Sequence, residues 1–342
     1  MIVGNEPIKL RTSRVIWITW ENQRRSVELA SALGAKLFLL AQSSSDIPNR
    51  ALRYTWLSLK TLRAIWSASP RLVFAQNPSL FLAALLCVTR KLLNFKLIVD
   101  RHSSFKFDKS GSFKWKLFHA VSWFTIRNAD LTVVTNAFLA GVVRDNGGRP
   151  FVLQDKLPTL TTGRASKLPN LCNAVMICGF GEDEPVLEMI EAARNLPLGW
   201  HLSITGKPSA YIQAWLKENV LPEQVEFCGF LPERDYQTLL RSADLLITLT
   251  RNEHTLNCGA YEATTLGKPM VLSNTRAIRE YFNKGAEYCN PNSDSISAAL
   301  LRATQNKSRL ADEATLLRSE LNSSWLHKFA DLVDTANALI AK

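Results

Sequence analysis

Short apolar runs alternate along the chain with longer segments in which apolar residues recur every three or four positions. The short runs are typical of strands buried on both faces, and the longer segments are typical of amphipathic helices. This alternation predicts parallel, doubly wound α/β sheets covered by helices. In the first half the expected strands are 15–19, 36–41, 72–75, 96–99, 131–134 and 151–154, and the expected helices are 22–33, 51–68, 78–94, 115–124 and 136–146.

A change in composition near the middle of the chain divides the pattern into two series. Residues 155–170 contain two prolines and several Thr and Ser residues without periodicity, which indicates an interdomain linker. The 342 residues are enough for two domains with separate cores. The expected strands of the second series are 174–178, 201–205, 225–228, 244–249, 270–272 and 285–290, and its expected helices are 185–195, 210–219, 235–242, 256–266, 293–304, 307–321 and 325–341. We therefore predict a Rossmann-like domain at 1–157, a linker at 158–170, a second Rossmann-like domain at 171–324 and a C-terminal helix at 325–342.

The stretch 243–282 combines the features of a nucleotide site. It predicts a buried strand, a polar loop at 250–255 and a helix that follows the loop. Ligands of parallel α/β sheets bind beyond the carboxyl ends of strands, where helix N-termini offer unpaired N–H groups and a positive dipole end. Glu262 lies three residues after Gly259, so both lie on one helix face. A carboxylate there can accept hydrogen bonds from ribose hydroxyls; the alternative is a glutamate that is merely solvated.

The same stretch resembles the signature of the retaining GT-B glycosyltransferases of the group 1 superfamily. Glu262-Ala263 and Gly267-Lys268-Pro269 match the second half of that signature. The position of the family's first glutamate is occupied by His254, and Glu253 lies one residue earlier, so either side chain can be its equivalent. The residues around Glu253 are most similar to a branch associated with bacterial surface polysaccharide synthesis.

The resemblance implies a GT-B fold, in which two doubly wound Rossmann-like domains face a cleft and the last helix packs back toward the first domain. It implies transfer of a sugar, with retention, from a nucleotide-diphosphate donor that is a co-substrate, and it implies no separate cofactor. Lys207 ends an expected strand and can pair with donor phosphates; Arg251 can do the same or be solvated. The expected donor-binding residues are Gly179, Gly206, Lys207, Thr250, Arg251, Glu253, His254, Thr255, Gly259 and Glu262.

The loop at 179–184 departs from the family pattern. The resemblance places a basic pair for the diphosphate there, whereas this chain has Glu182, Asp183 and Glu184. The positive charge must then come from Lys207, Arg251 and the helix N-terminus. This departure motivates one alternative, a non-catalytic partner subunit that keeps the fold, and a nucleotide-sugar epimerase is another.

Candidate acceptor residues follow two strands of the first series. His102 comes directly after a strand, and the resemblance has a histidine at the corresponding place. A histidine there can accept a proton from an acceptor hydroxyl or contact the transferring sugar, and Asp100 is the alternative base. Arg24, Arg25 and Ser26 can bind an acidic acceptor or simply begin a solvated helix. His102, His254 and Glu253 are thus the expected catalytic residues.

Charge is distributed unevenly between the two halves. Residues 1–165 contain 24 Lys and Arg against 9 Asp and Glu, whereas residues 166–342 contain 17 against 21. The segment 105–123 interleaves lysines with Phe and Trp, which suits an anionic bilayer surface and a lipid-linked or oligosaccharide acceptor. The alternative is a set of core aromatics with solvated lysines. No helix-turn-helix, zinc finger or RNP-type strand supports a nucleic-acid partner.

The sequence also carries information on metal use and on the cellular compartment. The sequence has no H-E-x-x-H motif and no Asp-x-Asp motif, so we expect a metal-independent site. The six cysteines show no C-x-x-C spacing, and the first residues lack the apolar core of a signal peptide. We therefore expect a cytoplasmic protein that can lie peripherally on the inner face of the cytoplasmic membrane.

Overall fold

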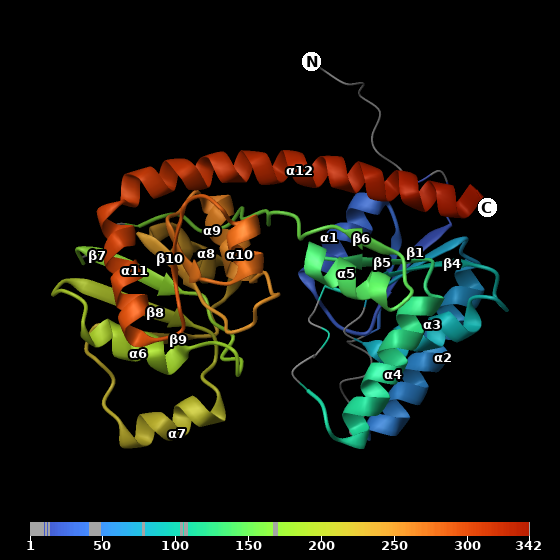
Figure 1. The fold of residues 1–342 in the computed structure, drawn as a ribbon, viewed down its shortest axis with the longest axis horizontal. Coiled ribbons are helices and arrows are strands. Elements are labelled where there is room, and N and C mark those ends of the chain that lie inside the picture. Colours follow the sequence, from blue (N-terminus) through green and yellow to red (C-terminus); the bar gives the residue numbers. More distant parts are fainter. Residues whose placement is uncertain are drawn as a thin grey trace, which may run out of the picture. The chain divides into compact units, whose positions relative to one another are not determined.

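The computed structural model describes residues 10, 12, 14–40, 49–76, 79–102, 105, 109–166 and 170–341. The chain divides into two compact units. Unit 1 contains Met1–Lys156 and Ser324–Lys342, and unit 2 contains Leu157–Ser323. Each unit has its own parallel six-stranded sheet with helices on both faces (Figure 1).

The sheet of unit 1 has the strand order β2-β1-β3-β4-β5-β6. Its strands are β1 (Val15–Thr19), β2 (Lys36–Leu39), β3 (Leu72–Gln76), β4 (Lys96–Asp100), β5 (Leu131–Val134) and β6 (Pro150–Val152). Its helices are α1 (Arg24–Leu33), α2 (Arg50–Ala68), α3 (Leu80–Thr89), α4 (Phe113–Asn128), α5 (Ala137–Asp145) and the last part of α12 (Lys307–Ala341). The chain reverses direction across the sheet between β1 and β3, which is the topological switch point where such sheets bind ligands.

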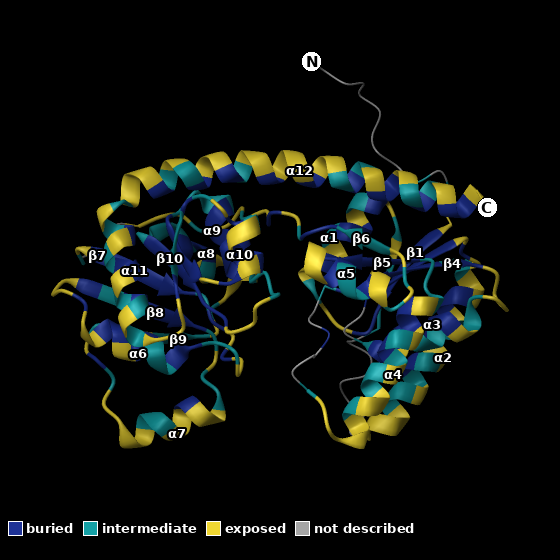
Figure 2. Cartoon of the chain, viewed as in Figure 1, coloured by how far each residue is buried: buried dark blue, intermediate teal, exposed yellow. Residues whose placement is uncertain are grey.

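Alternate residues of each strand supply the two core layers of unit 1. Trp17 faces α1 and the end of α12 and stacks on Phe74, with ring centroids 5.3 Å apart. Ile16 and Ile18 face the opposite layer, which α2 and α3 cover. The central strands β1, β3, β4 and β5 are therefore buried on both faces (Figure 2), which is why their sequences are continuous apolar runs.

The sheet of unit 2 has the order β12-β11-β10-β7-β8-β9. Its strands are β7 (Cys172–Met176), β8 (Trp200–Thr205), β9 (Val225–Gly229), β10 (Leu245–Thr248), β11 (Met270–Ser273) and β12 (Ala286–Cys289). Its helices are α6 (Val186–Arg194), α7 (Ala210–Glu218), α8 (Glu233–Ser242), α9 (Cys258–Leu266), α10 (Arg276–Tyr281), α11 (Ser293–Gln305) and the first part of α12. The switch point lies between β7 and β10, so the loops after these two strands mark the expected ligand position.

Three segments differ from the sequence prediction. The two helices expected at 307–321 and 325–341 are one helix, α12, and the break expected between them is wrong. The short helix α10 was not expected. The described part of the expected linker packs on α8, where the Thr162 amide donates to Gln237 Oε1 and Arg241 donates to the Leu160 carbonyl.

Candidate functional site

Helix α9 begins directly behind the loop that follows β10. Its N-cap residue, Asn257, makes no side-chain hydrogen bond to the first turn, so the amide groups there are not capped from within the helix. At the other end Gly267 adopts a left-handed conformation with φ of 64° and closes the helix. An uncapped N-terminus at a switch point is suited to an anion.

Glu262 lies in the second turn of α9 and is only 7 % exposed. The hydroxyl of Tyr236, on α8, donates a hydrogen bond of 2.6 Å to Glu262 Oε2. A buried carboxylate held in one orientation is a suitable acceptor for a pair of ligand hydroxyls. Tyr236 was not predicted from the sequence, because Tyr236 and Glu262 are 26 positions apart and come from different helices.

Gly259 is required by the packing of α9 on the sheet. A Cβ atom at this position would lie 2.2 Å from Thr248 Oγ1 and 2.9 Å from Ile177 Cβ. The glycine thus lets α9 approach the ends of β7 and β10 closely. A role for Gly259 in contact with the donor remains a prediction.

We expect the Gly259→Ala variant to lose about 1–3 kcal/mol of unfolding free energy, because the added methyl group overpacks a backbone-lined contact. Urea unfolding measures the loss. Gly141→Ala is the matched control: Gly141 lies within α5 with no atom within 4 Å of an added Cβ. That control should be neutral or stabilising, and equal losses in both variants would contradict the packing argument.

The loop between β10 and α9 is tied down by its own contacts. Thr250 is 1 % exposed and its amide donates to Ser273 Oγ at 2.7 Å. Glu253 Oε1 accepts from the amide of Arg276 at 2.7 Å and so occupies the N-terminus of α10. His254 and Thr255 are half-buried. Burial lowers the pKa of His254, although the charge of Glu253 opposes that effect.

Carboxylates occupy the loop after β7, where the resemblance placed basic residues. Glu184 accepts hydrogen bonds from the amides of Gly179, at 3.0 and 3.1 Å, and of Gly181, at 2.6 Å. Asp183 accepts from Thr250 Oγ1 and, at 2.9 Å, from Asn252 Nδ2. The Asp183 carboxylate therefore joins the two loops at the switch point, an arrangement that was not predicted from the sequence.

Two expected phosphate contacts lie beside these loops. Arg251 forms an ion pair with Glu188 at 2.6 Å, so its guanidinium has a partner already. Lys207 is exposed and follows Gly206, which has φ of 93°. A Cβ at position 206 would lie 2.2 Å from the Cys178 carbonyl oxygen, so only glycine fits there.

A pocket of about 580 Å³ in unit 2 borders the same loops. Gly181 and Glu184 line it on one side, and Tyr211, on α7, and Arg251 also contribute to its wall. The lining includes Arg251 and the carboxylate of Glu188 with which it pairs, so this ion pair forms part of the pocket surface.

In unit 1 the end of β4 brings three predicted residues together. Arg25 donates to both oxygens of Asp100, at distances from 2.8 to 3.1 Å, and also contacts Asp155. His102 Nδ1 lies 3.2 Å from Asp100 Oδ2. When Nδ1 donates to this carboxylate, Nε2 is left as a proton acceptor. The geometry therefore suits His102 as a base that Asp100 orients.

Burial and charge act in opposite directions on this cluster. Burial by itself raises the pKa of Asp100, but the charge of Arg25 and the hydrogen bond from His102 outweigh it, so the pKa lies well below its ordinary value. Asp100 is thus an ionised, buried anion. The same attraction keeps the pKa of Arg25 above its ordinary value despite burial.

The other predicted acceptor residues do not join the cluster. Ser26 is fully buried in α1, and Arg24 is half-exposed with Glu28 3.7 Å away. Binding of an acceptor by Arg24, Arg25 or Ser26 stays a prediction. In the described part of the chain no three His, Cys, Asp or Glu side chains are grouped as a metal site, and metal independence likewise stays a prediction.

Residues 177–315 match the sequence model of the family described as "Glycosyl transferases group 1". This segment is similar to the group 1 glycosyl transferases. It contains Glu262, the loop after β10 and most of unit 2, so the family resemblance of the sequence is confirmed for this part of the chain. No curated protein sequence matches the chain.

Solved structures resemble nearly the whole chain. Sucrose-phosphate synthase from Thermosynechococcus elongatus is 15 % identical with a TM-score of 0.72, over 90 % of this chain and 84 % of that protein. Anabaena HepE in complex with UDP and glucose is 15 % identical with a TM-score of 0.66, over 93 % and 91 %. A putative UDP-N-acetylglucosamine 2-epimerase from Listeria monocytogenes is 14 % identical with a TM-score of 0.62, over 91 % of each chain. At such identities the likeness concerns the fold, and the predicted GT-B class with two Rossmann-like halves is confirmed.

Proposed function

We propose that the chain is a metal-independent hexosyltransferase that moves a sugar from a UDP-linked donor to a lipid-linked saccharide in bacterial exopolysaccharide synthesis. One observation carries the donor half: the buried, oriented carboxylate of Glu262 lies behind the uncapped N-terminus of α9, inside the segment that matches the group 1 family. The complex of HepE with UDP and glucose supports UDP as the nucleotide.

The donor chemistry follows from these positions. Glu262 accepts hydrogen bonds from the ribose hydroxyls, and the first-turn amides of α9 stabilise the diphosphate as its bond to the sugar breaks. Lys207 adds a positive charge, and Arg251 adds a second one if it leaves Glu188. Gly179, Gly206, Gly259 and the polar loop residues complete the proposed donor site. The loop residues that contact the diphosphate and the sugar of the donor are Thr250, Glu253, His254 and Thr255.

An apolar pocket in unit 1 supports an acceptor with a hydrocarbon chain. It has a volume of about 1020 Å³ and lies between α2, α3 and α4. Trp20, Tyr54 and Phe118 are among the aromatic residues that line it. Arg53 and Lys114 add two positive charges and Glu21 one negative charge. A lipid tail can occupy the apolar walls while a phosphate lies near the cations. His102 would then accept the proton of the acceptor hydroxyl.

Peripheral attachment to an anionic membrane is part of the proposal. In the described residues no helix is long and apolar enough to span a membrane. Phe113 is 80 % exposed at the start of α4, beside the exposed Lys114 and Lys116. Exposed aromatics among lysines suit an anionic bilayer surface. Lys106 and Phe107, which belong to the same basic segment of the sequence, lie outside the described residues.

We expect Glu262→Gln to weaken UDP binding by about 10- to 100-fold, because the loss of a charge-assisted hydrogen bond costs roughly 1.5–3 kcal/mol. Isothermal titration calorimetry of the purified chain with UDP measures the change. Glu280→Gln is the matched control, since Glu280 is exposed on α10 and pairs there with Arg276.

Two outcomes would refute this assignment. Equal affinities of wild type and Glu262→Gln would remove Glu262 from the ribose. If UDP, ADP and GDP all failed to bind the wild type, the proposal of a transferase would be refuted.

Nuclear magnetic resonance of the product's anomeric centre tests the retention that the resemblance implies.

Each of two alternative functions has one observation in its favour. The likeness to the Listeria epimerase favours a nucleotide-sugar epimerase. The occupation of the Gly179 and Gly181 amides by Glu184 favours a non-catalytic partner, because those groups are not open to a diphosphate. Incubation with UDP-sugars separates the three: transfer or hydrolysis releases free UDP, epimerisation leaves the product sugar on UDP, and a non-catalytic partner changes nothing.

A further inference from the structure

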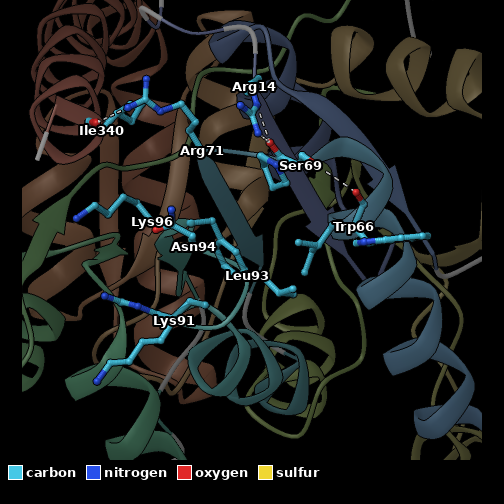
Figure 3. Close-up of a pocket in the computed structure, with 13 residues that line it drawn as sticks. Arg14, Trp66, Ser69, Arg71, Lys91, Leu93, Asn94, Lys96 and Ile340 are labelled. Atoms are coloured by element: carbon cyan, nitrogen blue, oxygen red, sulfur yellow. Dashed lines mark hydrogen bonds between the residues drawn. The ribbon is translucent and has the colours of Figure 1, made fainter.

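A second pocket of unit 1 has a volume of about 800 Å³ (Figure 3). It lies where β3 and β4 begin, at the opposite end of the sheet from Asp100 and His102. Its walls come from residues that precede β1 and β3, from the segment between α3 and the start of β4, and from the ends of α2 and α12. The charged and polar residues that line it are Arg14, Ser69, Arg71, Arg90, Lys91, Asn94 and Lys96, and the apolar ones are Ile65, Trp66, Pro70, Leu93, Phe95 and Ile340.

The lining contains five cations and no carboxylate, and one of the cations, Arg90, pairs with Asp130 at 2.7 Å. Arg14 donates to the Ser69 carbonyl at 2.6 Å, and Arg71 donates to the Ile340 carbonyl at 3.2 Å, so neither charge is neutralised. Lys91 is exposed and Lys96 half-buried, and neither forms an ion pair within the described ranges. In Figure 3 Asn94 lies between Arg71 on one side and Lys91 on the other. A concave site with this charge is complementary to an anion such as phosphate.

Large apolar side chains lie in and beside this basic pocket. Trp66, which lines it, is 79 % exposed at the end of α2, and Leu92, the residue between Lys91 and Leu93 of the lining, is 85 % exposed. Their exposure to water is unfavourable, and a soluble anion would not cover them. Helices α2, α3 and α4 contain no Asp or Glu, so they present no carboxylate that would repel an anionic surface. Tryptophan beside basic residues is typical of the membrane–water interface.

We propose that the basic pocket binds the phosphate headgroup of an anionic lipid while Trp66 and Leu92 enter the interface of the bilayer. A bilayer supplies both the phosphate and the apolar environment, which a nucleic acid or a free phosphate does not supply together. The inference rests on the membrane part of the proposed function and is independent of the transfer chemistry.

The test is flotation of the full chain with phosphatidylcholine vesicles that contain or lack phosphatidylglycerol. Lys91→Glu combined with Lys96→Glu should weaken binding to the anionic vesicles by at least about 30-fold, since each lysine near such a surface contributes about 1 kcal/mol. Trp66→Ala should weaken it about tenfold without changing the charge. The charge-matched control is Arg144→Glu with Arg149→Glu, two exposed positions at α5 and β6 of the same unit, which should change binding little.

Four outcomes would overturn the proposal. An unchanged Lys91/Lys96 variant would do so, as would an equal loss in the control, which would indicate a general effect of net charge. A wild type that bound no vesicle would overturn the pocket and the membrane part of the proposed function together, whereas UDP binding by calorimetry tests the transferase separately. Displacement from vesicles by inorganic phosphate or a single-stranded oligonucleotide at constant ionic strength would assign the pocket to a soluble anion.

Discussion

Replacing Arg25 with methionine should lower the unfolding free energy by about 3–5 kcal/mol at neutral pH, because it leaves a buried carboxylate without its cation. Asp100 is 1 % exposed, and Arg25 supplies the hydrogen bonds of 2.8 to 3.1 Å that hold its charge. Urea unfolding followed by circular dichroism measures the loss. Arg24→Met is the matched control: Arg24 is half-exposed, with Glu28 3.7 Å away, and should cost at most about 1 kcal/mol.

The pH dependence of this loss distinguishes a charge effect from a packing effect. In the wild type the pKa of Asp100 lies below its unfolded value, so its contribution to stability is present above the unfolded pKa and is lost as pH falls through the folded pKa. Without Arg25, burial raises the pKa instead, and protonation relieves the variant as pH falls. The difference between wild type and variant should therefore shrink toward about pH 4, near the unfolded pKa of an aspartate.

A second variant keeps the prediction testable if Arg25→Met expresses poorly. Combining it with Asp100→Leu removes the buried charge and should recover much of the stability. A loss in Arg25→Met that matched the Arg24→Met control, or a loss independent of pH, would contradict the role of the ion pair.

The sequence pattern was sufficient to predict the doubly wound architecture. Strands buried on both faces must be apolar, so each of them is visible as a run between amphipathic segments. The end of the chain was harder to predict, because Asn322, Ser323 and Ser324 resemble a helix break. They contain neither Gly nor Pro, and each costs a helix less than about 1 kcal/mol. Burial of Leu321 on one side and Trp325 on the other outweighs that cost, so α12 continues.

The candidate site was predicted only where one short stretch carries the information. Glu262 and the Gly267 turn follow from local pattern and from the family resemblance. Tyr236 and Asp183 could not be predicted, because their partners lie 26 and 67 residues away in the sequence. The contact of Glu253 could not be predicted for another reason. Its carboxylate caps α10, and this helix of six residues is too short to give a periodic signal in the sequence.

His102→Ala should lower the rate of sugar transfer by about 10²- to 10⁴-fold, the usual contribution of a positioned general base. Asp100 Oδ2 lies 3.2 Å from Nδ1 and orients the ring so that Nε2 can accept the hydroxyl proton. Binding of UDP should stay unchanged, since the proposed donor residues lie in unit 2. The turnover number with a UDP-sugar and a lipid-linked acceptor measures the loss, and calorimetry measures the binding.

The control for this prediction is His201→Ala, because His201 also faces a carboxylate, Glu226 at 3.2 Å, but lies on β8 away from the loops at the switch point. It should transfer at the wild-type rate. A variant that kept the wild-type rate would exclude His102 as the base. Asp100 is a poor replacement, because Arg25 donates to both of its oxygens and the pKa of this carboxyl lies well below its ordinary value.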